Sequence, residues 1–372
     1  MHGSDVMDIS QATVYFIDDQ SQVLSALRRA LRSRLKGWTM IFEASPRQAL
    51  DQMAKTLPWV VLVEKKMPEM DGADFLKQVK TNYPDAVRVI LSADISHDTV
   101  VQSAGIAHLL LSKPFELDEI VEVIERAVCL RTFQLDDKLR AEMGQVDNLP
   151  LLPANYQALV QYLDSVEEPD PAKVDTLLSH DVAVLSKILQ LANSAFFCAV
   201  NPVYSAREAV IRLGYDLVRK LVLCFSIYTA SGDTDLNSQL LRNSERVAEK
   251  CIELASFARL PKAQRERAYF TGLLHNIGAL VISGREVNAS FELVGSFLLR
   301  LWGFEQLIVD TLRYQSNPEA SGSDDVVLYQ LHIAKALVDA ENNNQPLEAL
   351  FDELDPKLIE QAMLSEYLES HV

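Results

Sequence analysis

Residues 59–72 decide the fold of the N-terminal part of the chain and read Trp-Val-Val-Leu-Val-Glu-Lys-Lys-Met-Pro-Glu-Met-Asp-Gly. The apolar run 59–63 is typical of a parallel strand that is buried on both faces. The run ends at Glu64, a polar segment with a proline and a glycine follows, and residues 74–82 then show helical spacing. This order of strand, loop and helix predicts one unit of an α/β fold.

The same order repeats along the first third of the chain. Amphipathic segments with helical spacing separate the apolar runs, and another helix begins near Glu116. The five predicted strands cover residues 14–17, 38–44, 59–63, 87–91 and 109–111. Five such units predict a doubly wound, five-stranded parallel sheet with right-handed crossovers.

Polar side chains stand where the predicted strands end. These are Asp18 and Asp19, Glu64, Ser92 and Lys113. In doubly wound sheets the carboxyl ends of the strands form the functional edge, so we expect these side chains to converge. Neighbouring carboxylates supply the oxygen ligands that Mg²⁺ prefers, so Asp18 and Asp19 can form a weak Mg²⁺ site. We expect no other metal or cofactor.

The text around these positions resembles response regulator receiver domains, which have a flavodoxin-like fold. The resemblance rests on Ile17-Asp-Asp19, on residues 61–72, on Ile90-Leu-Ser-Ala93 and on Ser112-Lys-Pro-Phe115. It implies an acidic pair at Asp18 and Asp19, a switch hydroxyl at Ser92, and the family's lysine at Lys113, followed by a cis proline. It covers residues 1–126.

Two positions depart from the receiver pattern. The resemblance places the phosphorylated Asp of the family at Glu64, whose carboxylate projects about 1–1.5 Å further, and reaction geometry is sensitive to such displacements. The aromatic switch position is Leu110. We therefore predict a receiver that does not switch by phosphorylation. Glu64 either reaches Lys113 and Ser92 and imitates a phosphorylated Asp, or it disables the switch.

Residues 127–147 are predicted to form a helical connector that extends the last receiver helix. No proline or glycine interrupts the text from Glu116 until Gly144. Apolar positions recur, but Arg131 and the pair at 136–137 interrupt the stripe. The pattern leaves open whether the connector forms a homodimer seam or packs on its own chain.

Residues 148–372 lack the alternation of strands and predict an all-helical domain with a C-terminal helical extension at 356–368. Four segments resemble the HDOD family, a non-catalytic relative of the metal-dependent HD phosphohydrolases. They are Ile188-Leu-Gln-Leu-Ala-Asn-Ser-Ala-Phe-Phe197, 209–214, 272–278 and 301–304. In the first motif, Asn193 and Ser194 either tie the next loop to the helix end or line a recognition groove, and we favour the first role. Phe196 and Phe197 are predicted core residues.

The catalytic alternative depends on metal ligands that this sequence has changed. An HD hydrolase needs an upstream His, an adjacent His-Asp pair and a late Asp. The corresponding positions are Asn243, His275-Asn276 and Lys335. One imidazole cannot hold a divalent metal usefully, and an ammonium opposes one, so we predict that the chain is not an enzyme.

The composition agrees with a signalling protein that binds other proteins. With 35 Lys and Arg against 52 Asp and Glu the net charge is -17, which disfavours nucleic acid and membrane surfaces as partners. Neither a signal peptide nor a membrane span is predicted, so we expect a cytoplasmic location. By resemblance the chain belongs to bacterial two-component or cyclic-di-GMP circuits, with a sensor kinase, a diguanylate cyclase or phosphodiesterase components as candidate partners. A phosphorylation-dependent regulator and, less favoured, a hydrolase of nucleotides or cyclic dinucleotides remain as alternatives.

Overall fold

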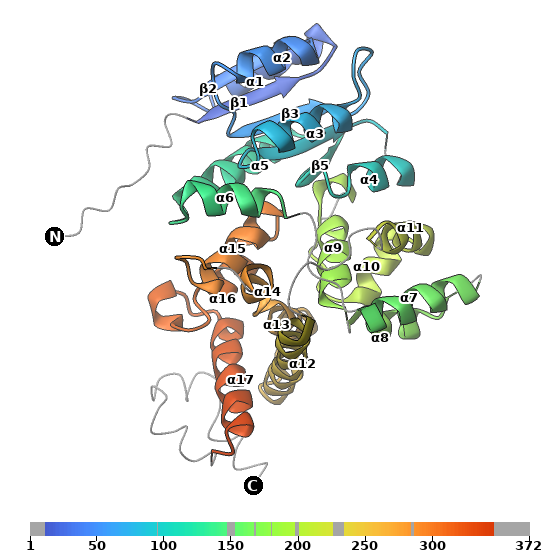
Figure 1. Ribbon diagram of the computed structural model, residues 1–372, viewed down its shortest axis with the longest axis vertical. Helices are drawn as coiled ribbons and strands as arrows, with labels where there is room; N and C mark the ends of the chain where they lie inside the picture. Colours follow the sequence, from blue (N-terminus) through green and yellow to red (C-terminus); the bar gives the residue numbers. More distant parts are fainter. Residues whose placement is uncertain are drawn as a thin grey trace, which may run out of the picture. The chain divides into compact units, whose positions relative to one another are not determined.

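The structure is a computed structural model, and it divides into two compact units. It describes residues 12–94, 96–146, 153–166, 169–179, 181–197, 201–225, 234–283 and 286–345. The first unit comprises residues 1–148, 190–201 and 300–304, and the second comprises the remainder of the chain. Figure 1 shows the elements of each unit in sequence colours.

A five-stranded, all-parallel sheet organises the first unit, with strand order β2-β1-β3-β4-β5. This confirms the predicted doubly wound α/β fold. The strands are β1 (Thr13–Ile17), β2 (Thr39–Glu43), β3 (Val60–Glu64), β4 (Val87–Ser92) and β5 (Leu109–Ser112). The connecting helices are α1 (Ser21–Leu31), α2 (Pro46–Met53), α3 (Gly72–Asn82), α4 (His97–Ser103) and α5 (Leu117–Cys129).

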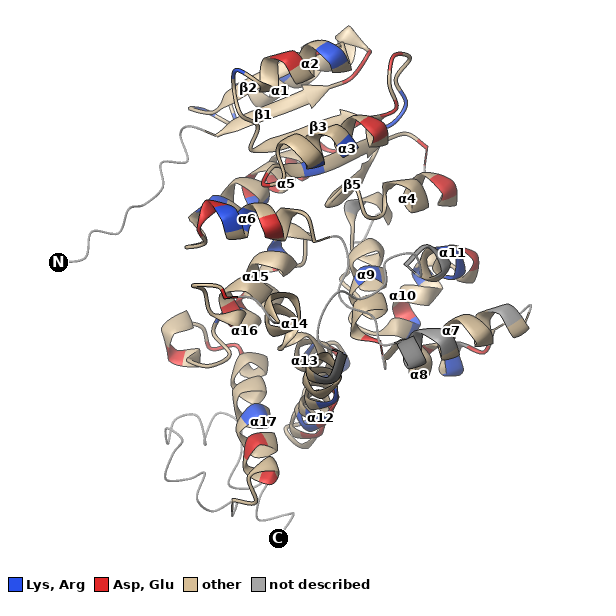
Figure 2. Cartoon of the chain, viewed as in Figure 1, with Lys and Arg blue, Asp and Glu red and all other residues tan. Residues whose placement is uncertain are grey.

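Both faces of the sheet are buried, and its central strands are mainly apolar on both sides, with Arg88 of β4 as a buried exception. On one face, Tyr15, Ile17 and Val63 pack with Phe75 and Leu76 of α3 in a single cluster. The opposite face is covered by α1 and α5, which contact β2 and β3. Figure 2 shows the strands largely free of charged residues, which gather on helices and loops. The charged residues that do lie on strands are therefore functional candidates.

The segment after α5 differs from the continuous helix that the sequence predicts. Helix α5 ends at Cys129, a 3-10 turn η2 (Leu130–Thr132) follows, and a separate helix α6 (Asp137–Gly144) begins after an extended stretch. The Asp136 carboxylate accepts a hydrogen bond from the Leu139 amide at 2.7 Å and so starts the new helix. The absence of proline and glycine was a poor guide, because a capping side chain can restart a helix without either.

Helix α6 packs on its own sheet through the buried Arg88 of β4. The Arg88 guanidinium is fully buried and donates to the carbonyl oxygens of Ile106 (2.7 Å) and Gly144 (2.9 Å). The His108 ring lies 2.8 Å from the same guanidinium. Of the two roles left open for the connector, these contacts favour packing on its own chain.

Helices form the second unit as the structure describes it. They are α7 (Pro153–Ser165), α8 (Pro171–Ser179), α9 (Val182–Ala192), α10 (Ala206–Leu213), α11 (Tyr215–Phe225), α12 (Thr234–Phe257), α13 (Lys262–Leu274), α14 (Ile277–Ile282), α15 (Phe291–Leu301), α16 (Gln306–Arg313) and α17 (Val326–Asn342). Two short turns are η3 (Ala195–Phe197) and η4 (Pro318–Ser321). The last residues of α9 and of α15, together with η3, are assigned to the first unit. The predicted mostly helical second half is thus confirmed.

Helices α12, α13 and α17 build the main core of the second unit. Cys251 and Leu254 of α12 pack with Ala268 of α13 and Leu331 of α17 in one buried cluster. The α12–α13 pair approaches closely at Gly272, where a Cβ atom would stand 2.6 Å from the Cα atom of Ala248. This close backbone approach explains the glycine in the 272–278 motif.

Two predictions concern residues that the structure does not describe. The predicted C-terminal extension at 356–368, like the boundary near residue 148, lies outside the described residues. Within the described residues, none of the helices combines the length and the apolar character that a membrane crossing requires.

Replacing Gly144 by alanine tests how tightly α6 is held. A Cβ atom at this position would lie 1.9 Å from the backbone oxygen of Pro84, so a backbone must move. We expect Gly144→Ala to lower the free energy of unfolding by about 1–3 kcal/mol, despite the better helix propensity of alanine. Urea unfolding monitored by circular dichroism measures this change. Lys138→Ala, on an exposed position of the same helix, is the control; equal stability of both variants would show that α6 is loosely attached.

Candidate functional site

Three charged residues from three strand ends meet at the carboxyl edge of the sheet. Asp18 follows β1, Glu64 ends β3 and Lys113 follows β5, as the parallel topology requires. The Lys113 ammonium lies 2.6 Å from Oδ2 of Asp18 and forms an ion pair with Oε2 of Glu64. All three side chains are largely buried. One cation therefore bridges two carboxylates.

The remaining oxygens of the two carboxylates accept backbone hydrogen bonds. Oδ1 of Asp18 accepts from the Gln20 amide at 2.9 Å, and Oε1 of Glu64 accepts from the Lys66 amide at 3.2 Å. Burial alone lowers the pKa of Lys113, but hydrogen bonds and charges from Asp18 and Glu64 outweigh it and raise that pKa. Lys113 is therefore positively charged throughout the physiological pH range.

The other predicted receiver residues lie around this ion pair in different roles. The Ser92 hydroxyl exchanges hydrogen bonds with the backbone of Asp94, at 3.1 and 3.0 Å, and not with Glu64. Leu110 is buried, whereas Asp19 is exposed. The Lys113–Pro114 peptide bond is cis. Of the two contacts by which Glu64 was expected to imitate a phosphorylated Asp, the structure forms the one with Lys113.

Sequence reasoning missed two lysines next to Glu64. The Lys65 ammonium is almost fully buried and contacts both carboxylate oxygens of Asp71, at 2.8 and 2.7 Å, and Oε1 of Gln102 at 3.1 Å. The Lys66 ammonium lies 2.7 Å from Asp94, and their hydrogen bond lowers the pKa of that carboxyl. The sequence signal that could have identified them is their position as two consecutive lysines directly after a buried strand. They connect the loop after β3 to the loop after β4 and to α4.

The weak Mg²⁺ site suggested at the acidic pair stays a prediction, and the structure shows what a cation would compete with there. Both oxygens of Asp18 are engaged, one with the Gln20 amide and one with the Lys113 ammonium. A divalent cation there would face the Lys113 charge at ion-pair distance. The described residues include no group of three or more His, Cys, Asp or Glu side chains that could hold a metal ion.

The second unit brings together the positions that correspond to HD metal ligands. The Asn276 amide donates to Oδ1 of Asn243 at 3.1 Å, which joins α12 to the start of α14. The His275 ring is buried and lies 2.7 Å from the Gly272 carbonyl oxygen through Nδ1, so Nδ1 carries the proton. Burial, with a smaller effect of the Lys335 charge, lowers the pKa of His275 to about 3. The imidazole is therefore neutral at physiological pH.

Lys335 places a positive charge in this neighbourhood. Its ammonium donates to the Ser316 hydroxyl at 3.3 Å and lies over the Phe291 ring. Burial lowers the pKa of Lys335, against the opposing charges of Glu292 and Asp339. The four positions compared with HD ligands are therefore two amides, one neutral imidazole and one ammonium, and none of these four side chains is an anionic ligand.

The motif at the end of α9 forms local bonds. The Ser194 hydroxyl donates to the Leu191 carbonyl oxygen at 2.7 Å, within its own helix end. Phe196 is buried, and its ring meets that of Phe197 edge to face with centroids 5.2 Å apart. Asn193 is half-buried beside them. The Ser194 contact is of the structural kind that we favoured over a recognition groove.

A buried acid starts the same helix. Oδ1 of Asp181 accepts hydrogen bonds from the Ala183 and Val184 amides, each at 3.1 Å, while Oδ2 has no partner among the described residues. Burial raises the pKa of Asp181 to about 6, although both amides act in the opposite direction.

Comparison with known families matches both halves of the chain. The response regulator receiver domain family matches residues 14–125, and the HDOD domain family matches residues 149–293. The chain is thus a response regulator-type protein in which a receiver domain precedes an HDOD domain. This confirms the family resemblances stated from the sequence.

Two curated relatives each match about a third of the chain. The hydrogenase transcriptional regulatory protein HoxA of Cupriavidus necator is 30% identical over 35% of this chain and 27% of its own length. The DNA-binding transcriptional regulator NtrC of Escherichia coli is 34% identical over 32% of this chain and 25% of its own length. The chain therefore spans about a quarter of each. The MmoQ response regulator structure from Methylococcus capsulatus is 21% identical, covers 58% of this chain and 93% of its own, and has a TM-score of 0.44.

The ion pair between Lys113 and Glu64 can be measured by a double-mutant cycle. Lys113→Met leaves two buried carboxylates uncompensated, and we expect a loss of about 3 kcal/mol in unfolding free energy. Adding Glu64→Gln should recover at least about 1 kcal/mol of that loss. Lys66→Met, at an exposed ion pair, should change the unfolding free energy far less than Lys113→Met does. Additive effects of the two changes in urea unfolding would refute the pairing.

Asp181 predicts a pH dependence of stability. Because its pKa is raised in the folded state, the unfolded chain loses this proton first, and stability falls as pH rises from about 4 to about 6. Asp181→Asn keeps the capping oxygen and removes the charge. At pH 7.5 it should be more stable than wild type by up to about 3 kcal/mol, and the gain should vanish near pH 4. The exposed cap variant Asp170→Asn should show no such trend; a constant difference across pH would contradict the assignment.

Proposed function

We propose that this protein is a non-catalytic signal-transduction regulator whose receiver does not switch by phosphorylation at the usual position. The observation that carries the proposal is the Glu64 carboxylate paired with the Lys113 ammonium. The resemblance places the phosphoacceptor at Glu64. The Glu64 carboxylate is therefore held by the Lys113 ammonium without a phosphoryl group.

The geometry opposes phosphoryl transfer in two ways. The longer Glu64 side chain displaces the accepting oxygen by about 1–1.5 Å from where an aspartate would present it. Phosphoryl transfer also depends on cations that neutralise the developing charge, and both oxygens of Asp18 are already engaged by the Gln20 amide and the Lys113 ammonium. The only cation beside Glu64 within this strand-end group, Lys113, is shared with Asp18.

The state of the receiver is proposed to be fixed rather than regulated at this edge. The ion pairs of Lys65 and Lys66 support this, because they hold the loops after β3 and β4 that would have to move. Ser92 is engaged by the Asp94 backbone within the same loop. A change of state would require several charge-assisted contacts to break together.

The output is proposed to be protein binding by the HDOD domain. The cluster around His275 supports this, since it combines neutral amides, a neutral imidazole and the Lys335 amine. Sensor kinases and the enzymes that make or degrade cyclic dinucleotides are candidate partners in keeping with the family. A hydrolase would show a bound transition metal in elemental analysis together with turnover of nucleotides.

Intact-mass analysis after incubation with acetyl phosphate and Mg²⁺ tests the proposal. We expect wild type to gain no stoichiometric phosphoryl mass, because Glu64 is displaced and already paired. Glu64→Ala is the background control. A full-occupancy adduct on wild type that disappears in Glu64→Ala would refute the proposal and favour the phosphorylation-dependent regulator.

A pull-down completes the test by linking Glu64 to output. Wild type, Glu64→Asp and Glu64→Ala are compared as full-length baits. If Glu64 fixes the receiver state, both variants should change the recovery of bound partners. An identical bound set for all three baits would show that output does not depend on Glu64.

A further inference from the structure

Among the described residues, no strand pairs with the outer edge of β2. Strand β2 is the first in the sheet order and pairs with β1 alone. The Thr39 amide donates to Ala12 at 2.8 Å and the Glu43 carbonyl oxygen accepts from Asp18 at 3.4 Å, so these residues face β1. Backbone groups alternate in direction along a strand, so those of Met40 and Phe42 face outward. Proteins usually protect such edges with lysine, proline or a bulge.

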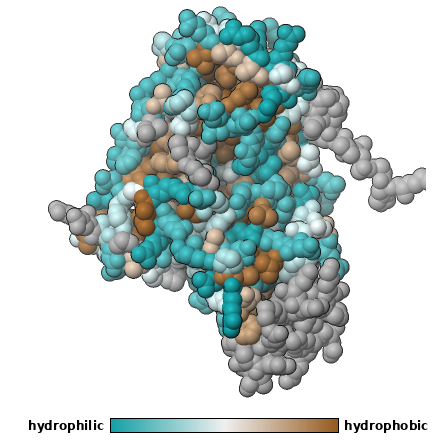
Figure 3. Space-filling model, turned by 180° about the vertical axis from the view of Figure 1, so that it is seen from behind, coloured by the Kyte–Doolittle hydropathy of each residue, from teal (hydrophilic) through white to brown (hydrophobic). Residues whose placement is uncertain are grey.

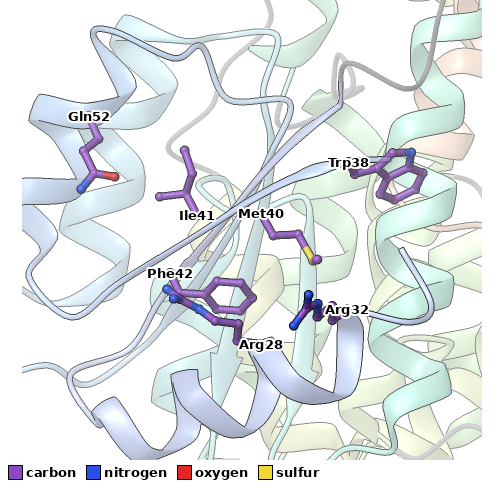
Figure 4. A pocket seen from close by; sticks show the side chains of 7 residues that line it. All are labelled: Arg28, Arg32, Trp38, Met40, Ile41, Phe42 and Gln52. Carbon is purple, nitrogen blue, oxygen red and sulfur yellow. The ribbon is translucent and has the colours of Figure 1, made fainter. Parts of the chain in front are cut away.

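Apolar side chains line this edge on both faces of the strand. Trp38, Met40 and Phe42 project on the face covered by α1, and Ile41 projects on the face of α2, all of them only partly buried. They surround an open pocket of about 520 Å³. Figure 4 shows these side chains flanking the strand, and Figure 3 shows apolar side chains reaching the surface among hydrophilic ones.

Two arginines complete the pocket, Arg28 within α1 and Arg32 directly after the end of that helix. Arg28 lies over the Phe42 ring, 4.9 Å from its centroid, and Arg32 is exposed one turn further along the chain. Figure 4 shows both guanidinium groups on the Met40 and Phe42 side. The structure gives neither an ion pair with a described residue. In a chain with net charge -17 this is a local positive patch.

We propose that the β2 edge binds an extended acidic peptide segment of a partner protein, which pairs with β2 as an added strand. The outward groups of Met40 and Phe42 would supply the main-chain hydrogen bonds, and Arg28 and Arg32 would pair with carboxylates at alternate positions of the peptide. Trp and Arg are the residues that most often dominate binding energy at interfaces. This site lies on the receiver domain, so it goes beyond the protein binding proposed above for the HDOD domain.

Charge distinguishes this occupant from a second copy of the chain. Two β2 edges paired about a twofold axis normal to the sheet would keep α1 on the same face and bring four arginines together, which is unfavourable. The Glu43 carboxylate accepts hydrogen bonds from the Ala44 and Ser45 amides and from Gln52, which hold it at the end of the strand. A partner that brings its own carboxylates meets no such penalty.

Selection from a displayed library of random 12-residue peptides on the full-length chain tests the proposal. We expect enriched peptides to be acidic, with apolar residues at alternate positions. The best peptide is then synthesised and its affinity measured by fluorescence anisotropy. Arg28→Glu combined with Arg32→Glu should weaken it at least tenfold, and Arg47→Glu, an exposed basic residue outside the pocket, should stay within twofold.

A proline variant tests the strand pairing itself. Met40→Pro removes only the outward amide, which edge strands tolerate, and should also weaken binding at least tenfold while circular dichroism stays unchanged. Hydrogen exchange of residues 38–43 should slow when the peptide binds to wild type. Enrichment of neutral or basic peptides, equal binding of polyglutamate, or a wild-type dimer that Met40→Pro dissociates would each overturn the proposal. The phosphodonor experiment does not involve β2, so either proposal can fail alone.

Discussion

The Lys113 ammonium between two buried carboxylates determines what the strand-end site can do. Asp18 is 1% exposed and Glu64 is 7% exposed, so neither charge is well hydrated, and each repels the other. A single shared cation compensates both. Any ligand that needs these oxygens competes with Lys113 for them. A phosphoryl group and a divalent cation compete with the same interaction.

The two lysines after Glu64 extend this constraint to the loops. Lys65 is anchored by Asp71 at the start of α3 and by Gln102 of α4, and Lys66 is paired with Asp94. The first contact is buried and the second is exposed, so they differ in strength. Together they connect the acceptor loop to the segment that holds Ser92. The Ser92 hydroxyl itself bonds to the Asp94 backbone within that segment.

The sequence allowed prediction of the sheet and of which residues share its functional edge, because apolar runs and parallel topology determine both. It did not allow prediction of how Lys113 divides its bonds, or that Ser92 would bond to Asp94, since rotamers depend on contacts made after folding. The prediction of a continuous connector helix was wrong for another reason. Asp136 caps a new helix, a local hydrogen bond that competes with continuing α5 and that helical periodicity does not reveal. Whether Glu64 replaces a phosphoacceptor also stays a prediction.

A receiver that is fixed at its strand ends must receive information through binding energy. A partner shifts a conformational equilibrium only by its difference in affinity for the two states, so the surface it uses matters more than its total affinity. The net charge of -17 repels an acidic partner at long range, and only the patch on α1 attracts it locally. Encounter would therefore be slow at low salt, and short-range strand pairing at Met40 and Phe42 would have to supply most of the affinity. Main-chain hydrogen bonds meet this requirement because, unlike the arginine contacts, salt hardly screens them.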